Sequence, residues 1–484
     1  MTSQDKVSLY DQKLKNLNDL LEMGVNAYGA RYEGTEKISK VRADFEEGKN
    51  VKIAGRIMAY RGHGKSIFID LKDLTGKMQI YVQKNAIGEE NFAVFKKIEA
   101  GDIIGVEGEM FMTRMGEPTV GVRNFTVLSK SLLPLPEKWH GLKDVELRYR
   151  QRYVDLIVND DVREVFILRS KIIRSIRSLL DEKGFLEVET PMMQHLAGGA
   201  TARPFETYHN ALGVPLFLRI APELFLKRLL VGGLERVYEL NRNFRNEGIS
   251  RRHNPEFTML EVYQAYADYE IMMDLTEEII STVAKQVWGT TKRTMKDGRE
   301  LDLTPPWPRI KLNDAVTDAS GIDFMTVPDP IGAARQLKID VSDKMTRDEI
   351  LAEAFEKLVE HNLYQPTFIT HYPASLCPLA KTFEDDPDTT ARFELIMRGH
   401  ELANAYSELN NPIEQRKRLL SQVEKSGEDK SIDEDFVRAM EYGMPPAGGL
   451  GIGIDRLVMA LADCDSIRDV ILFPQLKPQQ VSSS

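Results

Sequence analysis

The chain has 484 residues, enough for roughly two to four domains of ordinary size. Its balance of 42% hydrophobic and 29% charged residues is typical of a soluble globular protein. No apolar run is long enough for a transmembrane helix or a signal peptide, so we expect no membrane partner. The net charge of −10 argues against a protein that coats DNA, although a local basic patch can still bind nucleic acid. Cys377 and Cys464 are the only cysteines, which predicts no four-cysteine zinc site and a reduced, cytoplasmic setting.

Residues 1–50 form an N-terminal extension that begins with one amphipathic helix. A polar stretch then runs to about Asn50, and we expect it to lack regular structure. From residue 51 to 130 the apolar period changes to two. Three strands, a helix and two strands in this span predict a five-stranded Greek-key barrel of the oligonucleotide-binding (OB) type. Two prolines mark 131–150 as a linker.

The outer face of the predicted barrel has the composition of a base-binding surface. Ile67 and Ile69 point inward, so Phe68 between them points outward. Gln79 points outward on the next strand, and Arg61 lies nearby. A ring, an amide and a cation are suited to stack on unpaired bases and read an edge. The alternative is a ring packed against a neighbouring domain.

Residues 151–484 predict one larger α+β domain with an insertion at about 285–385. Its expected elements are a helix at 161–183, a strand at 185–189, a helix from 221 to 233, a hairpin ending at 263, strands at 392–398 and 401–409, and a glycine-rich strand at 448–453 followed by a helix.

The hairpin from Arg245 to Tyr263 carries the strongest signal. If both pieces are strands, Arg245 lies beside Glu247, and Phe257 shares a face with Glu261 and Tyr263. A guanidinium, a flat ring and a polar row suit a nucleotide and a small polar substrate. The alternative is an ordinary hairpin with solvent-facing charges. The candidate residues are Arg245, Glu247, His253, Asn254, Phe257, Glu261 and Tyr263.

Two further patterns also suit a nucleotide and a small polar substrate. Glu394 and Glu401 flank a Gly-His turn, and paired carboxylates beside a polyphosphate suit Mg²⁺. Asn404, Tyr406 and Glu408 share one strand face, whose oxygens suit the three donors of an ammonium group. Each pattern has a plain alternative, since carboxylates near a turn and polar strand faces are usually solvated.

The glycine strand at 448–453 ends just before Arg456, at the start of a helix. Glycines allow a ligand or another backbone to approach closely. A dinucleotide fingerprint is a poor match, because the strand-to-helix context and the acidic residue are wrong for it. The alternative is a packing glycine run followed by a surface arginine.

Taken together, these residues resemble the class II aminoacyl-tRNA synthetases, and among them the lysyl-tRNA synthetases of bacterial type. The similarity runs from about Asn50 to Pro478. The three class-defining motifs occur in order, as GFLEVETP at 184–191, FRNEG at 244–248 continuing to Phe257, and GLGIGIDR at 449–456. The lysine branch is indicated by GGA at 198–200, IAPEL at 220–224 and SELN at 407–410.

The resemblance implies an antiparallel catalytic sheet flanked by helices, and a homodimer formed through the first motif. It implies ATP, lysine and tRNA(Lys) as substrates, and Mg²⁺ as the metal. By similarity, Arg245 and Arg456 are catalytic, and ATP is bound by Arg245, Glu247, His253, Asn254, Phe257, Glu401 and Arg456. By the same similarity, lysine is bound by Gly199, Glu223, Glu261, Tyr263, Asn404, Tyr406 and Glu408, the metal by Glu394 and Glu401, and the anticodon by Arg61, Phe68 and Gln79.

The expected activity is ATP-dependent attachment of lysine to tRNA(Lys) through a lysyl-adenylate. Three alternatives remain: the aspartyl and asparaginyl enzymes of the same subclass, a truncated relative that attaches lysine to a protein, and a catalytically dead RNA-binding paralogue. Two glutamates in the pocket disfavour an anionic substrate, the intact barrel disfavours the protein modifier, and the intact arginines and glutamates disfavour a dead paralogue.

Overall fold

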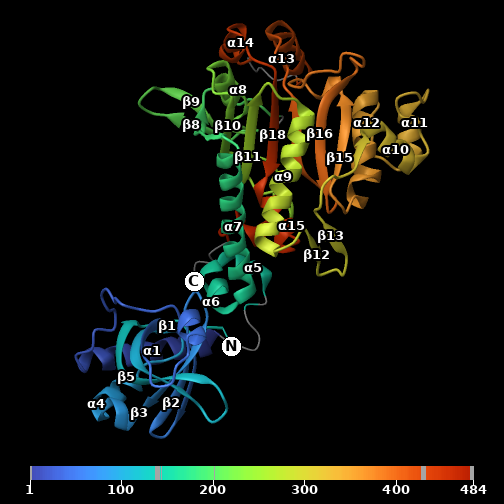
Figure 1. The fold of residues 1–484 in the computed structure, drawn as a ribbon. Coiled ribbons are helices and arrows are strands. Elements are labelled where there is room, and N and C mark those ends of the chain that lie inside the picture. The colour runs from blue at the N-terminus through green and yellow to red at the C-terminus, as the bar shows by residue number, and fades with distance from the viewer. Residues whose placement is uncertain (1–2, 137–141, 143, 201, 427–431, 480–484) are drawn as a thin grey trace. The chain divides into compact units, whose positions relative to one another are not determined.

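The computed structural model describes residues 3–136, 142, 144–200, 202–426 and 432–479. The chain forms two compact units, Met1–Lys143 and Asp144–Ser484 (Figure 1). None of the helices within the described ranges is long and apolar enough to cross a membrane. The predicted linker at 131–150 lies partly outside the described residues, and its last six residues, Val145–Arg150, form a helix of the second unit.

The first unit is a closed five-stranded barrel with strand order β1-β2-β3-β5-β4. Inward residues such as Ile67, Ile69, Met78 and Ile80 alternate with less buried neighbours and fill the barrel. The predicted OB-type barrel is thereby confirmed. Its elements are α1 (Ser3–Glu22), α2 (Ile38–Ala43), β1 (Asn50–His63), β2 (Ser66–Lys72), β3 (Lys77–Gln83), α3 (Lys84–Ile87), α4 (Glu89–Phe95), β4 (Ile103–Met112) and β5 (Pro118–Ser129).

The polar stretch before Asn50 is not without structure, and this expectation was wrong. It contains α2, whose Ile38 and Val41 are almost fully buried in the barrel core. Asp73 caps the helix, because its Oδ2 accepts a hydrogen bond from the Ile38 backbone N–H at 3.0 Å. Two apolar residues in one short turn give too weak a periodic signal to detect in the sequence.

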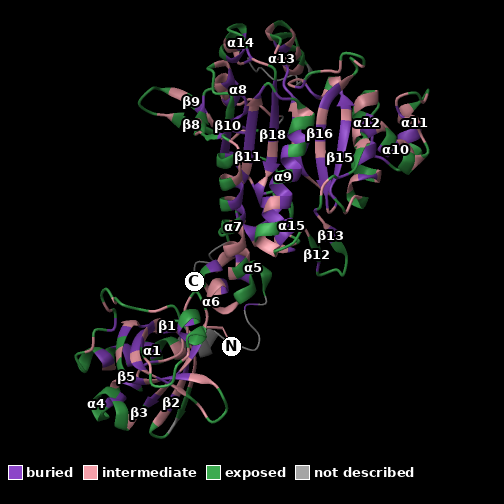
Figure 2. Ribbon diagram, in the orientation of Figure 1, coloured by how far each residue is buried: buried purple, intermediate pink, exposed green. Residues whose placement is uncertain are grey.

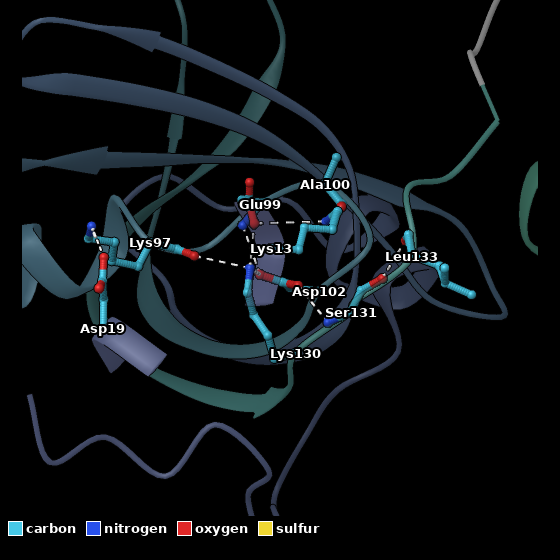
Figure 3. A network of polar contacts seen from close by, with 9 residues as sticks. All are labelled: Lys13, Asp19, Lys97, Glu99, Ala100, Asp102, Lys130, Ser131 and Leu133. Carbon is cyan, nitrogen blue, oxygen red and sulfur yellow. Dashed lines mark hydrogen bonds and ion pairs between the residues drawn. The ribbon is translucent and has the colours of Figure 1, made fainter. Parts of the chain in front are cut away.

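A buried ion network joins α1 to the barrel (Figure 3). The Lys130 ammonium is fully buried and lies 2.7 Å from Glu99 Oε2 and 2.8 Å from Asp102 Oδ2. It also donates to the Lys97 carbonyl at 3.1 Å, and Lys13 on α1 donates to the Ala100 carbonyl at 3.0 Å. Every donor of Lys130 thus has an oxygen within reach, as a buried charge requires.

The second unit is built on an eight-stranded sheet of order β14-β15-β16-β17-β18-β11-β10-β6. All neighbours are antiparallel except the outermost pairs, β14 with β15 and β10 with β6. Its strands are β6 (Leu186–Glu187), β10 (Arg236–Phe244), β11 (Glu256–Ala265), β14 (Arg309–Lys311), β15 (Thr367–Pro373), β16 (Thr389–Met397), β17 (His400–Ser407) and β18 (Ala447–Gly453). Two small sheets stand apart: β7 (Met193–Gln194) with β8 (Glu206–His209) and β9 (Val214–Leu218), and β12 (Lys292–Thr294) with β13 (Glu300–Asp302).

One face of the large sheet is covered by helices, and it forms the main core. Three helices pack on it: α7 (Asp160–Glu182), α9 (Tyr269–Trp288) and α15 (Ile454–Ala462) (Figure 1). Every second residue of the central strands points into this core, including Leu260, Val262, Ala405, Leu450 and Ile452. The central strands are correspondingly buried (Figure 2). The α+β class predicted from the sequence is confirmed.

The remaining helices surround the sheet at its ends and edges. They are α5 (Val145–Arg150), α6 (Arg152–Val158), α8 (Glu223–Val231), α10 (Leu312–Ser320), α11 (Pro330–Gln336), α12 (Arg347–Leu358), α13 (Pro412–Ser426), α14 (Glu434–Glu441) and α16 (Ile467–Val470). Helices α10, α11 and α12 form a separate apolar cluster beside β15. Part of the 285–385 stretch therefore belongs to the main sheet, through β14 and β15.

The hairpin of the second motif is shorter than predicted. Strand β10 ends at Phe244, so Arg245 and Glu247 lie in the loop and not on a shared strand face. The Arg245 backbone N–H donates to the Pro255 carbonyl at 2.9 Å, which closes the loop at its base. Glycine, asparagine and proline in residues 246–255 favour loop geometry over a continued ladder.

Candidate functional site

The open face of the sheet is hollowed along β18. This strand lies between β11 and β17, and its Gly449, Gly451 and Gly453 are on the face opposite the core. Gly451 pairs with Glu261 on one side and with Asn404 on the other. A floor without side chains therefore runs between two polar walls.

Gly449 is required by this arrangement for steric reasons. A Cβ at this position would lie 1.9 Å from Glu408 Oε1 and 2.6 Å from Tyr263 Cε1. Neither distance is compatible with a side chain, so only glycine lets this carboxylate and this ring approach the strand.

The resulting cavity has a volume of about 420 Å³ and brings together residues from distant parts of the chain. Glu408 and Glu394 do not line it, whereas the other predicted nucleotide and amino-acid residues do. Those residues are Gly199, Glu223, Arg245, Glu247, His253, Asn254, Phe257, Glu261, Tyr263, Glu401, Asn404, Tyr406 and Arg456.

Two arginines define the cationic end of the cavity. Arg245 has its guanidinium 5.2 Å from the centroid of the Phe257 ring, and its buried Nε has no hydrogen-bond partner among the described residues. Burial lowers the pKa of Arg245, and Glu401 opposes that effect. Arg456 donates to the Glu401 carbonyl at 2.6 Å and lies 3.5 Å from His253 Nε2. A half-buried guanidinium with an unpartnered Nε, beside an aromatic ring, is suited to an anionic group on a flat heterocycle.

The buried carboxylate of the preceding residue, Asp455, helps to fix the position of Arg456. Asp455 opens α15, and its Oδ2 accepts the Thr258 backbone N–H at 2.7 Å. Its Oδ1 accepts from Arg169 at 2.6 Å. These bonds tie α7, β11 and α15 together, which orders the neighbouring Arg456. Asn254 has a similar supporting role, because its side chain bonds the backbone of Glu256 and Gln475.

Carboxylates define the opposite end of the cavity. Tyr406 donates to Glu223 Oε1 at 2.8 Å, and Tyr263 donates to Glu261 Oε2 at 3.2 Å. Burial, together with the nearby Glu223, raises the pKa of Glu261 to about 8. Glu261 has no salt-bridge partner among the described residues, and a ligand with ammonium groups would supply positive charge at this end.

Glu408 lies just beyond the end of β17 and does not line the cavity. It pairs with Lys227, which was not among the predicted site residues. Its Oε2 is 2.5 Å from the Nζ of the fully buried Lys227 on α8. Its Oε1, buried beneath Gly449, has no hydrogen-bond partner among the described residues. Lys227 is one helical turn from Glu223, a spacing that could have predicted their contact.

The two predicted metal ligands differ in their surroundings. Glu401 lines the cavity and pairs with Ile396 across the strands, two residues from Glu394, after a bulge at Leu395. Both oxygens of Glu394 have partners, with Arg392 2.5 Å from Oε1 and the Tyr372 hydroxyl 2.8 Å from Oε2. Burial raises the pKa of Glu394, which Arg392 opposes and Glu401 reinforces. No cluster of three or more metal-binding side chains occurs in the parts of the chain that the structure describes.

The three predicted anticodon residues share the outer face of β1–β3, each with a protein partner. Arg61 donates to Asp70 Oδ1 at 2.8 Å, and Gln79 Oε1 accepts from Thr119 at 3.0 Å. The Phe68 ring lies 4.6 Å from the Tyr81 ring, which in turn contacts Phe111 at 5.9 Å. Phe111 extends this aromatic row and was missed, because it lies on β4, far along the chain.

Comparisons with known proteins agree with this architecture. Residues 144–477 match the family described as "tRNA synthetases class II (D, K and N)", and residues 51–128 match "OB-fold nucleic acid binding domain". The chain therefore belongs to the class II tRNA synthetases.

Within that class, three similar proteins share one name. The chain is 56% identical to a lysine–tRNA ligase of Carboxydothermus hydrogenoformans, over 99% of this chain and 100% of the relative. It is 56% identical to that of Pelotomaculum thermopropionicum, over 99% and 96%, and 52% identical to that of Bacillus subtilis, over 95% and 95%. The resemblance to class II lysyl-tRNA synthetases seen in the sequence is confirmed.

Proposed function

We propose that the protein attaches L-lysine to tRNA(Lys) in an ATP-dependent reaction through a lysyl-adenylate. One observation carries this proposal: a single cavity has at one end a half-buried guanidinium whose Nε lacks a partner among the described residues, and buried carboxylates at the other. The polar ends match the phosphate and the ammonium groups of lysyl-adenylate. The identity to lysine–tRNA ligases over nearly the whole chain supports the same function.

The first step is attack of the lysine carboxylate on the α-phosphorus of ATP. The new bond joins carboxylate oxygen to phosphorus, and pyrophosphate leaves with the electrons of the broken bond. A carboxylate is already a nucleophile, so no side-chain base is needed. Arg245 binds the α-phosphate and the carboxylate, Arg456 and His253 bind the outer phosphates, and Phe257 stacks on adenine. Catalysis is positioning and charge stabilisation.

The second step transfers the lysyl group to tRNA. A terminal ribose hydroxyl attacks the carbonyl carbon, the bond to the phosphate oxygen breaks, and AMP leaves. The hydroxyl proton goes to solvent or to the leaving phosphate. Arg245 keeps the adenylate in place during this transfer.

Lysine is favoured over the substrates of related enzymes by the charge of the pocket. Gly199 and Glu223 bind the α-ammonium, with Glu261 nearby, while Glu408 and Tyr263 bind the ε-ammonium. Asn404 and Tyr406 complete the wall. An aspartate side chain would add a negative charge beside these carboxylates, and a neutral side chain would leave one of them without a counter-ion.

A divalent cation, Mg²⁺ in our proposal, fits beside Glu401, which offers a partly exposed carboxylate at the cavity wall. Glu394 is the second ligand, although it would have to exchange its contact with Arg392 or Tyr372. When bound, the ion neutralises charge on the phosphates.

We further propose that the barrel binds the anticodon through Arg61, Phe68 and Gln79, and that the protein is a cytoplasmic homodimer. The first motif lies near exposed apolar side chains at Leu186 and Met193, beside the edge strand β6, which supports a contact with a second copy. Light scattering tests this directly, and a concentration-independent monomer mass would contradict it.

The deciding experiment is ATP–pyrophosphate exchange with each of the twenty amino acids, followed by charging of tRNA(Lys). We expect exchange to depend on lysine and charging to follow. Exchange with aspartate or asparagine, or no exchange with any amino acid, would refute the proposal.

A further inference from the structure

Lys227 is a fully buried cation at the back of the amino-acid end of the cavity. It lies on α8, one turn after Glu223, and its side chain has no exposed surface. Its Nζ is 2.7 Å from Glu223 Oε1 and 2.5 Å from Glu408 Oε2. It is also 5.6 Å from the centroid of the Tyr406 ring. Lys227 does not line the cavity, so its ammonium acts through Glu223, which does, and through Glu408, whose Oε1 lies against the cavity floor at Gly449.

The contact with Glu223 fixes the direction of that carboxylate. Lys227 and the Tyr406 hydroxyl both donate a hydrogen bond to Oε1 of Glu223. Glu223 itself lines the cavity. Two donors on one oxygen hold the carboxylate group in a single orientation, with its other oxygen left for a ligand.

The contact with Glu408 favours the charged form of that carboxyl group. Burial raises the pKa of Glu408 to about 8, the Lys227 ammonium opposes this rise, and Glu223 adds to it. Without the lysine, Glu408 would lose its fixed cation and would stay protonated to a higher pH. The charged and titratable groups that face this cluster are Glu223 and Lys227 on α8, Glu239 on β10, Arg245 in the following loop, Glu261 and Tyr263 on β11, and Tyr406 and Glu408 at the end of β17.

We propose that Lys227 is a positioning residue for the amino-acid pocket. Its ammonium orients Glu223 and is the fixed counter-ion of Glu408 before a substrate enters. The inference rests on the proposed function, and it names a residue that sets the specificity for a dicationic amino acid. Lys227 then contacts Oε2 of Glu408, and the ε-ammonium of the substrate contacts Oε1.

The test compares Lys227→Met with the wild type in lysine-dependent pyrophosphate exchange between pH 7 and 9. Methionine keeps the length and apolar stem of lysine but not its charge. At pH 7 we expect the KM for lysine to rise about 10–100-fold, because Glu223 loses a donor that orients it and Glu408 loses its counter-ion. The KM should begin to fall only above about pH 8, because no ammonium then opposes the raised pKa of Glu408, while the KM for ATP stays unchanged. Lys227→Arg should retain most of the wild-type affinity at pH 7.

The matched control is Lys130→Met in the barrel, which removes an equally buried ammonium between two carboxylates. It should leave the KM for lysine and its pH profile unchanged. An unchanged KM in Lys227→Met at pH 7 would overturn the inference. So would parallel losses for lysine and ATP without recovery at high pH, since these indicate a merely structural role.

Two further comparisons keep the outcome decisive. If Lys227→Met does not fold, the double variant Lys227→Met/Glu408→Gln replaces it, and its KM for lysine should be high throughout the pH range. A wild-type KM in the double variant would refute the inference. If the wild type exchanges with another amino acid, the proposed function fails separately. The KM for that amino acid must then still shift with pH in Lys227→Met, because Glu223 binds its α-ammonium.

Discussion

The barrel and the catalytic unit each bury a lysine between two carboxylates, with different results. Lys130 in the barrel contacts Glu99 and Asp102 and the Lys97 carbonyl. Asp102 also accepts the backbone N–H groups of Glu99 and Ser131, so its oxygens are used within the protein. This network is closed, and it joins a helix to a barrel.

The cluster around Lys227 is open by contrast, because some of its buried polar atoms have no partner among the described residues. Glu408 Oε1 is buried without a partner among the described residues, and Glu261 has a raised pKa of about 8. A buried polar atom without a partner destabilises the fold unless a ligand satisfies it. The network around Lys130 is therefore structural, whereas the substrate would complete the network around Lys227.

The largest expected effect comes from removing the cation at the phosphate end of the cavity. Arg245→Ala should lower the rate of lysine-dependent pyrophosphate exchange by about 10³-fold or more, because the transition-state charge on the α-phosphate loses its partner. Arg335→Ala is the control, since Arg335 forms only an exposed pair with Asp343. An unchanged rate in Arg245→Ala would remove the arginine from the mechanism.

The closed network predicts a loss of stability without a loss of exchange activity. Lys130→Met should lower the free energy of unfolding of the barrel by about 3–5 kcal/mol, because the buried Asp102 and the partly buried Glu99 lose their counter-ion. Hydrogen exchange of peptides from β1–β5 measures this change. Lys77→Met, at the half-exposed partner of Asp70, should cost less than about 1 kcal/mol. Equal effects of both variants would contradict the importance of the buried network.

The open cluster predicts a loss of specificity. Glu408→Gln should reduce the preference for lysine over its neutral analogue norleucine by about 10–100-fold, because the neutral amide no longer requires an ammonium. The measurement is the ratio of kcat/KM values in pyrophosphate exchange. Glu434→Gln changes an exposed carboxylate paired with Arg416 and should leave the ratio as it is. A ratio retained in Glu408→Gln would place the ε-ammonium elsewhere.

The smallest effect concerns the glycine floor. Gly449→Ala adds a methyl group that must displace Glu408 or Tyr263, so the KM for lysine should rise about 10-fold. Gly121→Ala in β5 is the comparison, because its Cβ would lie 3.5 Å or more from its neighbours. A normal KM for lysine in Gly449→Ala would show that the floor tolerates a side chain.

Local patterns in the sequence were sufficient for much of the fold. Alternation around Ile67 and Met78 predicted the barrel, and the spacing of Asn404 and Tyr406 correctly placed both on one strand face. The glycine strand was also predicted as a place of close approach. These features depend on residues two apart, which the sequence shows directly.

Features that depend on distant contacts could not be predicted in the same way. Lys227 pairs with Glu408 across two elements far apart in the chain, and its spacing from Glu223 on α8 indicates only the contact with Glu223. The β-bulge at Leu395 determines how Glu401 lies relative to Glu394. No residue type in the sequence indicates this bulge. The end of β10 before Arg245 depends on loop closure by Pro255, which strand periodicity does not reveal.

Calorimetric titration with an uncleavable sulfamoyl analogue of lysyl-adenylate tests most directly whether both ends of the cavity bind one molecule. We expect the lysyl analogue to bind at least 10³-fold more tightly than the aspartyl analogue, and Arg245→Ala and Glu408→Gln each to weaken it. Equal affinity for the two analogues, or full affinity in both variants, would contradict a common site for phosphate and ammonium.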